Sequence, residues 1–392
     1  MNELLKKRIS AINSGIIPKG YKKTKVGIVP VEWEEKRIEN ICEMKSGNTI
    51  TAKKFDDSGE YPCYGGNGLR GFTNSFTHHG KYVIIGRQGA LCGNVKLVNG
   101  CFFASEHAIV VTNTNSNCDY TYYLLDYMNL NRYSESSAQP GLSVEKILRL
   151  KILLPPLPEQ QKIAEILSTQ DKLIELYERK IEQLKTLKKG YLQKMFPKKG
   201  CKYPELRFKG FTDDWEQRKV GDIADRYDNL RVPVAANLRI HGDTPYYGAN
   251  GIQDYVAGYT HEGEFVLVAE DGANDLKNYP VQCVKGRIWV NNHAHVIQGK
   301  ADVSDNRFLS YTLHRTDIES LLVGGGRAKL NAEILMGIIL QLPSLQEQQQ
   351  IGHFFQNVDN LITLHQHKLD KEKQKKKALM QLLLTGKVRV ST

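Results

Sequence analysis

Two stretches of the chain place apolar residues every three or four positions over about five heptads. The first begins at Glu159 and is ended by Pro197; at about 38 residues it would span roughly 57 Å as a helix. Its apolar positions, with tyrosine accepted at two of them, are Ile163, Ile166, Leu173, Tyr177, Leu184, Leu187 and Tyr191. The second stretch keeps this pattern at both of its ends, with Ile351, Phe354, Val358, Leu361, Leu379 and Leu382. We expect the two helices to pair antiparallel, although each could instead lie on its own module.

The segments between these stretches are predicted to mix strands and helices. Residues 81–85 and 264–269 are dense in aromatic and β-branched residues and are bounded by turn residues, which is typical of strands. Residues 150–154 and 338–342 read as further strands that lead through proline into the long helices. Asp119 and Asp305 are suitable N-caps for one amphipathic helix each. The pattern predicts α+β domains of about 140 residues.

The chain contains an internal repeat, which explains why these features occur in pairs. Residues 154–180 return as residues 342–368 with matching Leu-Pro, Glu-Gln-Gln and Asp-x-Leu-Ile-x-Leu positions. The repeat extends upstream, where the earlier segments 32–41, 61–72, 82–90 and 105–111 match the later segments 214–223, 244–255, 265–273 and 291–297. Two copies of one module, each followed by one long helix, therefore cover nearly the whole chain.

The repeat also decides how to interpret a glycine-rich segment. Gly66, Gly68 and Gly71 have the G-x-G-x-x-G spacing of a dinucleotide-binding turn. In the second copy Ala249 and Asp254 replace two of these glycines, whereas both copies keep Tyr-Gly-x-Asn-Gly. An Asn-Gly pair between β-like runs favours a tight hairpin turn. We therefore predict a turn here and no phosphate loop.

Composition and charge narrow the class of protein. The 392 residues are 41% apolar and 25% charged, as in ordinary soluble proteins, and no segment resembles a membrane span or a signal peptide. Seven scattered cysteines suggest reduced thiols in a cytoplasm. The net charge of +11 suits a polyanionic partner. Basic clusters occur at residues 22–25, 188–190 and 373–377, although each could be a solvated helix end or tail.

A tandem of α+β modules, each ending in LPxLxEQQ and a long helix, resembles the specificity subunit of type I DNA restriction–modification systems. The resemblance runs from about residue 17 to the C-terminus and includes the segments 17–33 and 207–225. It implies two target recognition domains, each reading one half of a bipartite site in double-stranded DNA. The long helices would set the spacer between the half-sites and dock two adenine-methyltransferase modification subunits, and restriction (translocase/nuclease) subunits would join the complex.

The expected organisation follows from the repeat and the resemblance together. It comprises an N-terminal helix (residues 1–14), recognition domain 1 (15–155), spacer helix 1 (156–198), recognition domain 2 (199–343), and spacer helix 2 with a tail (344–392). The resemblance implies a non-catalytic cytoplasmic subunit without membrane contact. S-adenosylmethionine, ATP and Mg would belong to partner subunits.

Residues that differ between the two copies, inside segments that otherwise match, are the candidate readers of the DNA sequence. Arg87 and Gln88 align with Glu270 and Asp271, and Gln139 aligns with Arg327, with Lys329 nearby. Arginine can bind guanine, glutamine adenine, and a carboxylate can accept from cytosine. Further candidates are Asn48, Thr49, Lys53, Arg70, Asn74 and His79 in the first module, and Arg231, Asn237, Arg239, Gln253, Asn274 and Lys277 in the second. Each one by itself could be a solvated surface residue.

Shared residues are expected to serve the scaffold instead. His107 and His293 lie beside alanine in apolar strands and are interpreted as core histidines, with base contacts as the alternative. Glu159 and Glu347 begin the long helices, where a carboxylate suits the helix dipole; docking to the modification subunit is also compatible.

Catalytic motifs are not evident in the sequence. The Asn/Asp-Pro-Pro-aromatic motif of an adenine methyltransferase and a Walker A sequence are both missing, and no histidine group has metal-ligand spacing. Asp254 with Asp275 and Lys277 could form an acid plus D-x-K nuclease site, although the first module has no counterpart. A self-contained enzyme and a coiled-coil scaffold that binds only proteins remain the alternatives.

Overall fold

The computed structural model describes residues 3–51, 54–56, 58–135, 140–198, 200–324 and 328–390. The chain forms two compact units. Unit 1 contains residues 1–178 and 367–392, and unit 2 contains residues 179–366. Each unit therefore combines one copy of the repeated module with one end of each long helix.

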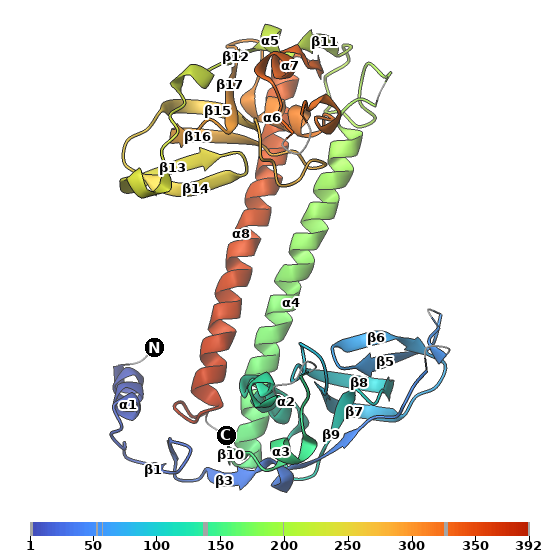
Figure 1. The fold of residues 1–392 in the computed structure, drawn as a ribbon, viewed down its shortest axis with the longest axis vertical. Helices are drawn as coiled ribbons and strands as arrows, with labels where there is room; N and C mark the ends of the chain where they lie inside the picture. Colours follow the sequence, from blue (N-terminus) through green and yellow to red (C-terminus); the bar gives the residue numbers. More distant parts are fainter. Residues whose placement is uncertain are drawn as a thin grey trace. The chain divides into compact units, whose positions relative to one another are not determined.

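Unit 1 is built on a six-stranded sheet (Figure 1). Its strands lie in the order β4 (Cys42–Ser46), β9 (Ala108–Asn113), β7 (His78–Gly86), β8 (Val95–Ala104), β5 (Tyr61–Gly65) and β6 (Gly68–Thr73). The β5–β8 pair is parallel and the other pairs are antiparallel. Two smaller antiparallel pairs are β1 (Tyr21–Lys23) with β2 (Ile28–Pro30), and β3 (Glu34–Arg37) with β10 (Lys151–Leu154).

Unit 2 repeats the topology of the six-stranded sheet strand for strand (Figure 1). Its sheet has the order β12 (Ala224–Arg226), β17 (Ala294–Gly299), β15 (His261–Ala269), β16 (Val281–Val290), β13 (His241–Gly248) and β14 (Gly251–Val256). The β13–β16 pair is parallel, and β11 (Glu216–Lys219) pairs with β18 (Ile339–Leu342) as β3 does with β10. The internal repeat and the α+β class are confirmed.

Short helices cover the sheets and connect the strands. The α-helices are α1 (Glu3–Asn13), α2 (Cys118–Tyr127), α3 (Val144–Leu148), α5 (Val220–Ile223), α6 (Asn306–His314) and α7 (Ala332–Gly337). Single 3-10 turns are η1 (Ile38–Asn40), η3 (Leu130–Tyr133), η4 (Asp228–Leu230), η5 (Ala236–Leu238) and η6 (Glu319–Leu321).

One of the two predicted N-caps is confirmed and the other is wrong. The Asp305 side chain accepts a hydrogen bond from the backbone N–H of Phe308 and caps α6. In α2 the cap is Asn117, which accepts from the N–H of Tyr120, so the helix begins two residues earlier than predicted. Asp119 lies in the first turn, where its carboxylate pairs with Lys81 of β7 at 2.6 Å.

The long helices α4 (Leu157–Lys194) and α8 (Leu345–Leu383) run side by side in opposite directions within each unit (Figure 1). In unit 1 the first half of α4 meets the end of α8, where Gln170 donates to the Glu372 carboxylate at 2.6 Å. In unit 2 the end of α4 meets the first half of α8, where the rings of Tyr191 and Phe354 lie 5.1 Å apart. The antiparallel pairing is confirmed, and the 38 residues of α4 match the predicted length.

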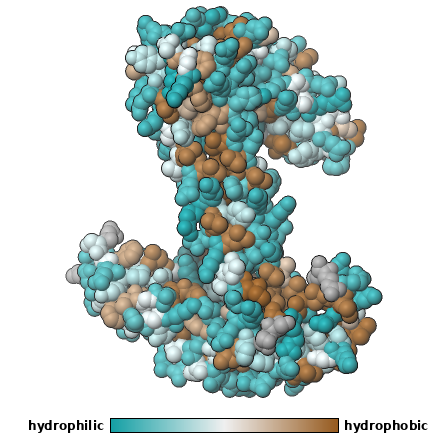
Figure 2. All heavy atoms as spheres, turned by 180° about the vertical axis from the view of Figure 1, so that it is seen from behind, coloured by the Kyte–Doolittle hydropathy of each residue, from teal (hydrophilic) through white to brown (hydrophobic). Residues whose placement is uncertain are grey.

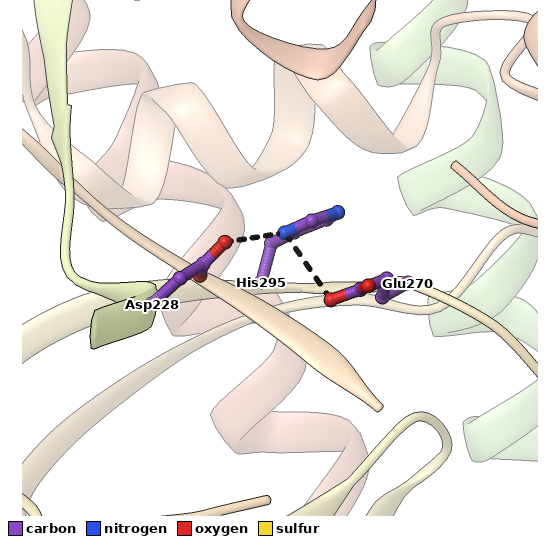
Figure 3. A group of neighbouring side chains, drawn as sticks. All are labelled: Asp228, Glu270 and His295. Atoms are coloured by element: carbon purple, nitrogen blue, oxygen red, sulfur yellow. Dashed lines mark hydrogen bonds and ion pairs between the residues drawn. The ribbon is translucent and has the colours of Figure 1, made fainter. Parts of the chain in front are cut away.

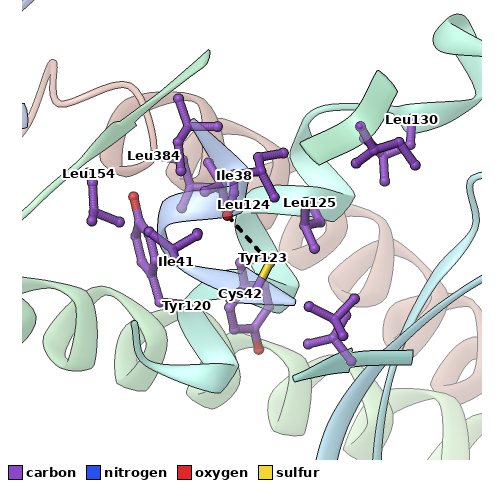
Figure 4. Close-up of a cluster of buried hydrophobic side chains, with 14 of the residues drawn as sticks. Ile38, Ile41, Cys42, Tyr120, Tyr123, Leu124, Leu125, Leu130, Leu154 and Leu384 are labelled. Carbon is purple, nitrogen blue, oxygen red and sulfur yellow. Dashed lines mark hydrogen bonds between the residues drawn. The ribbon is translucent and has the colours of Figure 1, made fainter. Parts of the chain in front are cut away.

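Each module is completed by the end of the helix that follows the other module. Leu384, just after α8, is buried in the unit 1 core with Ile38, Leu124 and Leu154 (Figure 4). Phe196, just after α4, is buried in the equivalent core of unit 2. The segment after α8 in unit 1 and the segment after α4 in unit 2 therefore occupy corresponding positions.

Glu159 and Glu347 are more than helix-dipole partners. Both side chains are fully buried. Glu159 accepts from Arg389 at 2.9 Å and from the Trp33 indole at 3.1 Å, and Glu347 forms a bidentate pair with Arg207 at 2.7 Å. Each carboxylate thus fixes the segment that follows the opposite helix, and the interpretation as helix-dipole partners alone was incomplete.

Within the described ranges, no helix has the length and apolar character needed to span a membrane.

Candidate nucleic-acid interface

The glycine-rich segment of the first module is a hairpin turn. Gly65 of β5 faces Gly68 of β6, and Gly68 has a positive φ of 87°, which favours glycine. In the second module Gly248 faces Gly251, whose φ is 108°. A strand follows each turn, whereas a phosphate loop requires a helix N-terminus there. The predicted turn is confirmed in both copies.

Three segments converge beside the hairpin turn in unit 1. The Arg87 N–H, directly after β7, donates to the His107 carbonyl at 2.8 Å. Gly86 lies so close to the turn that a Cβ there would be 1.9 Å from the Gly66 carbonyl oxygen. Gln88, His107 and Arg70 line an open hollow of about 340 Å³ between these segments. The end of β7, the start of β9 and the hairpin turn therefore form one polar site.

Within this site Gln88 and His107 are hydrogen-bonded. The Gln88 Oε1 and His107 Nδ1 atoms lie 2.7 Å apart, and the Arg87 guanidinium donates to the Ser46 hydroxyl at 3.0 Å. The His107 side chain is 41% exposed and also lies 3.2 Å from Glu106. The prediction that His107 is a core histidine is wrong, because the turn before β9 points its ring out of the sheet toward Gln88.

Unit 2 keeps this backbone frame and changes the side chains. The Glu270 N–H donates to the His293 carbonyl at 2.9 Å, as Arg87 does in unit 1. His293 Nδ1 lies 2.5 Å from Asp271, and its side chain is 36% exposed, so it is not a core histidine either. The hairpin residue Asn250 donates to the Gly272 carbonyl at 2.8 Å and accepts from the Asn274 N–H at 2.9 Å. A shared histidine thus contacts a different side chain in each unit.

A cluster of buried charges lies under the unit 2 site (Figure 3). His295 Nδ1 lies 2.7 Å from Asp228 and 3.7 Å from Glu270. Arg231 and Lys329 each reach Glu270 at 2.6 Å. These two cations balance the two carboxylates, so the cluster is an ion-pair network that needs no metal ion for neutrality.

The network also shifts the acidity of its carboxylates. Burial alone would raise the pKa of Asp228, but hydrogen bonds from His295 and the Val296 N–H hold that pKa below its ordinary value. For Glu270, hydrogen bonds from Lys329 and Arg231 likewise overcome burial and lower the pKa. The positions that match Asp228, Glu270 and His295 in unit 1 are Ser46, Arg87 and Ile109, so the first module has no such network.

The remaining candidate readers fall into groups. Arg231 and Glu270 are bound within their own unit, and Arg239 lies over the Tyr246 ring at 4.2 Å. Exposed in loops or on strands are Asn48, Thr49, Arg70, Asn74, His79, Gln88, Asn237, Gln253, Asn274, Lys277 and Lys329. Asp271 is half-buried against His293. Lys53, Gln139 and Arg327 lie outside the described residues.

Not all exposed candidates are brought together. His79 is near the start of β7 and Gln88 follows its end, which separates them by roughly 30 Å at the rise of a β-strand. Asn74 lies at the far end of the β5–β6 hairpin, where it donates to Asp56 at 3.2 Å. The site beside the turn therefore contains Arg70 and Gln88, but not Asn74 or His79.

Three residues of the site were missed by sequence reasoning. Asn250 fixes the unit 2 turn to the loop after β15, and His107 and His293 contact the divergent residues. All three belong to segments shared by both copies, which sequence reasoning assigned to scaffold. Their proximity to the divergent positions would have identified them, but the sequence alone does not show which residues are close in space.

The residues of the candidate nuclease motif stabilise local backbone and side-chain structure. Asp275 accepts from the N–H groups of Lys277 and Asn278, both at 3.0 Å, which is an Asx turn. Asp254 lies 3.4 Å from Arg239. Both carboxylates are therefore engaged in loop contacts.

Comparison with known proteins agrees with this architecture. Residues 30–186 and 212–373 match the type I restriction modification DNA specificity domain. A type I restriction enzyme specificity subunit from Haemophilus influenzae is 45% identical over 147 residues, and the EcoprrI specificity subunit from Escherichia coli is 44% identical over 148 residues. These matches cover 38% and 36% of this chain but only 37% of either relative.

Longer matches extend over nearly the whole chain. The MjaX specificity subunit from Methanocaldococcus jannaschii is 27% identical over 95% of this chain and 97% of its own length. The crystal structure of a type I restriction–modification S subunit from M. genitalium shares the fold, with a TM-score of 0.73 at 17% identity over 90% of this chain and 96% of that one. With both modules matched by the family domain, this chain belongs to the type I restriction modification DNA specificity family.

Proposed function

We propose that this chain is the DNA sequence-specificity subunit of a type I restriction–modification complex, in which each module reads one half of a bipartite site. The observation that carries the proposal is a single backbone frame with different side chains in the two units. Gln88 follows β7 where Asp271 follows β15, and each contacts the same shared histidine. Two similar readers with different chemistry suit two different half-sites.

The proposed reading of bases uses the residues beside the hairpin turns. The Gln88 amide can pair with adenine, and the Asp271 carboxylate can accept from the cytosine amino group. His107 and His293 would hold these groups in position. Lys277, Lys329 and Arg70 would contact phosphates or base edges, and the net charge of +11 favours binding to the DNA backbone.

The catalytic steps would belong to partner subunits. In this proposal two adenine-methyltransferase subunits bind along the long helices and supply the S-adenosylmethionine site, and restriction subunits supply ATP-driven and Mg-dependent chemistry. Apolar side chains are exposed on the helices, including Leu176, Leu187, Leu361 and Leu364 (Figure 2). Such exposure on a helix pair is typical of a surface that other helices cover.

The deciding experiment is single-molecule methylation mapping of host DNA with the chain present and deleted, alongside its modification partner. A split adenine-methylation motif that vanishes on deletion supports the proposal. Asp271→Ala should then change the bases tolerated in one half of the motif and leave the other half intact. An unchanged methylome would favour a protein-binding scaffold, and DNA cleavage by the purified chain that is lost in Asp275→Ala would favour a nuclease.

A further inference from the structure

A groove in unit 1, lined by both apolar and polar residues, lies away from the hairpin-turn site. It has a volume of about 680 Å³. It is lined by Leu124 and Tyr127 of α2, Ile152 of β10 and Val26 of the β1–β2 turn. Tyr127 is 39% exposed and Val26 is 47% exposed. The groove therefore presents both apolar and polar side chains to solvent.

The same position in unit 2 is nearly filled. The hollow there measures about 170 Å³ and is lined by Thr312, Arg315 and Leu340, which match Leu124, Tyr127 and Ile152 in the repeat. Arg315 lies over the Phe196 ring at 4.6 Å, and Gln341 donates to the Cys201 carbonyl at 2.7 Å. The linker after α4 therefore packs at this position in unit 2, whereas the described residues after α8 leave a larger groove in unit 1.

The open groove is bordered by positive charge. A second hollow of about 490 Å³ shares Tyr127 with it and is lined by lysines at the end of α8. Among the described residues no aspartate or glutamate lines either hollow. Several of the lysines are paired with carboxylates elsewhere, but Arg132, Lys377 and Lys387 have no carboxylate partner in the part of the chain that the structure describes.

We propose that this groove binds an acidic amphipathic segment of a modification subunit, an inference that rests on the proposed function. The apolar side of the segment would cover Val26, Tyr127 and Ile152. Its carboxylates would pair with Arg132, Lys377 and Lys387, which supplies the charge complementarity that specific interfaces use. Because the equivalent position in unit 2 is filled, one of the two modification subunits gains a contact that the other lacks.

The test is a calorimetric titration of purified modification subunit into the full chain. Groove variants Val26→Asp and Arg132→Glu are compared with Val31→Asp, an exposed apolar residue of the same N-terminal segment, and Arg149→Glu, an exposed arginine of the same module. We expect each groove variant to weaken one of two binding steps about tenfold or more, as loss of a central interface contact does, and the other step to persist. The affected step should also weaken as salt increases.

The outcomes separate this inference from the proposed function. Groove variants that bind both copies as the wild type does, or control variants that weaken binding equally, would overturn the docking site and leave the specificity role standing. A wild-type chain that binds no modification subunit would overturn both. If the groove variants lose DNA affinity but not protein affinity, the groove binds phosphates and the proposal is wrong.

A second measurement does not depend on the stability of these variants. Benzoylphenylalanine replaces Tyr127, and the complex is illuminated in the presence of the modification subunit and of DNA. Crosslinks to an acidic amphipathic stretch of the modification subunit are expected. Crosslinks only to DNA, or only to a second copy of this chain, would contradict the proposal.

Discussion

Lys188 of α4 holds Asp359 of α8 through both carboxylate oxygens, at 2.6 and 2.8 Å. The hydroxyl of Tyr311 donates to the same carboxylate at 2.6 Å. Unit 1 contains the same triad with the helices exchanged, because Lys376 of α8 and the Tyr123 hydroxyl both contact Asp171 of α4. Lysine, aspartate and tyrosine therefore fasten each helix pair to the α2 or α6 helix of its own unit.

Removal of the lysine charge from the unit 2 triad should destabilise that unit. Lys188→Met leaves the partly buried Asp359 with only its tyrosine donor, and we expect the free energy of unfolding to fall by about 1–2 kcal/mol. Urea unfolding followed by a probe in unit 2 measures the change. Lys162→Met is the matched control, because its ion pair with Glu165 is exposed on the same helix and should contribute almost nothing.

The buried pair between the tail and the start of α4 should matter more. Arg389→Met leaves the fully buried Glu159 with the Trp33 indole as its remaining donor, and loss of one partner of a buried pair costs about 3–5 kcal/mol. Thermal unfolding of unit 1 should shift strongly, while unit 2 keeps its own Arg207–Glu347 pair. A shift no larger than that of Arg149→Met would show that the tail does not complete unit 1.

Acid should destabilise unit 2 before unit 1. The pKa values of Asp228 and Glu270 are depressed in the folded state, so their stabilisation is complete above their ordinary values of 3.8 and 4.5 and is lost as pH falls through the lower folded-state values. The matching unit 1 positions hold Ser46 and Arg87, neither of which carries a carboxylate. Calorimetry between about pH 7 and pH 3 should show the steeper loss in unit 2. Asp228→Asn combined with Glu270→Gln should flatten that dependence.

The tight approach of Gly86 to the hairpin should be essential to the unit 1 site. Gly86→Ala places a methyl group 1.9 Å from the Gly66 carbonyl oxygen, so the turn must move. We expect a loss of roughly 1–3 kcal/mol in stability together with impaired methylation dependent on the first half-site. Gly141→Ala is the control, since its Cβ would meet only the Arg87 carbonyl at 3.8 Å.

Truncation of a proposed base reader should relax one position of the DNA site. Gln88→Ala should lower discrimination at one base pair of one half-site by about 1–3 kcal/mol, with the other half unaffected. Methylation of a substrate library randomised across the site measures this. Asn99→Ala, in β8 opposite Lys81 of β7 and away from Gln88, should leave the motif unchanged.

The repeated modules, the strands and the long helices could be predicted from the sequence, because each depends on local periodicity that recurs within the chain. Residues 81–85 and 264–269 lie in β7 and β15, and the helix predicted from Glu159 is α4. The choice between hairpin turn and phosphate loop was also settled by the sequence, since Ala249 and Asp254 break the glycine spacing in the second copy.

Tertiary structure alone decided which distant residues meet. His107 and His293 follow apolar strands and read as core residues, but the turns before β9 and β17 direct both rings outward to Gln88 and Asp271. Arg389 and Glu159 are separated by most of the chain and are joined because the tail after α8 completes the first module. Local periodicity reports which face of an element is buried, whereas such pairings depend on long-range packing that no local pattern encodes.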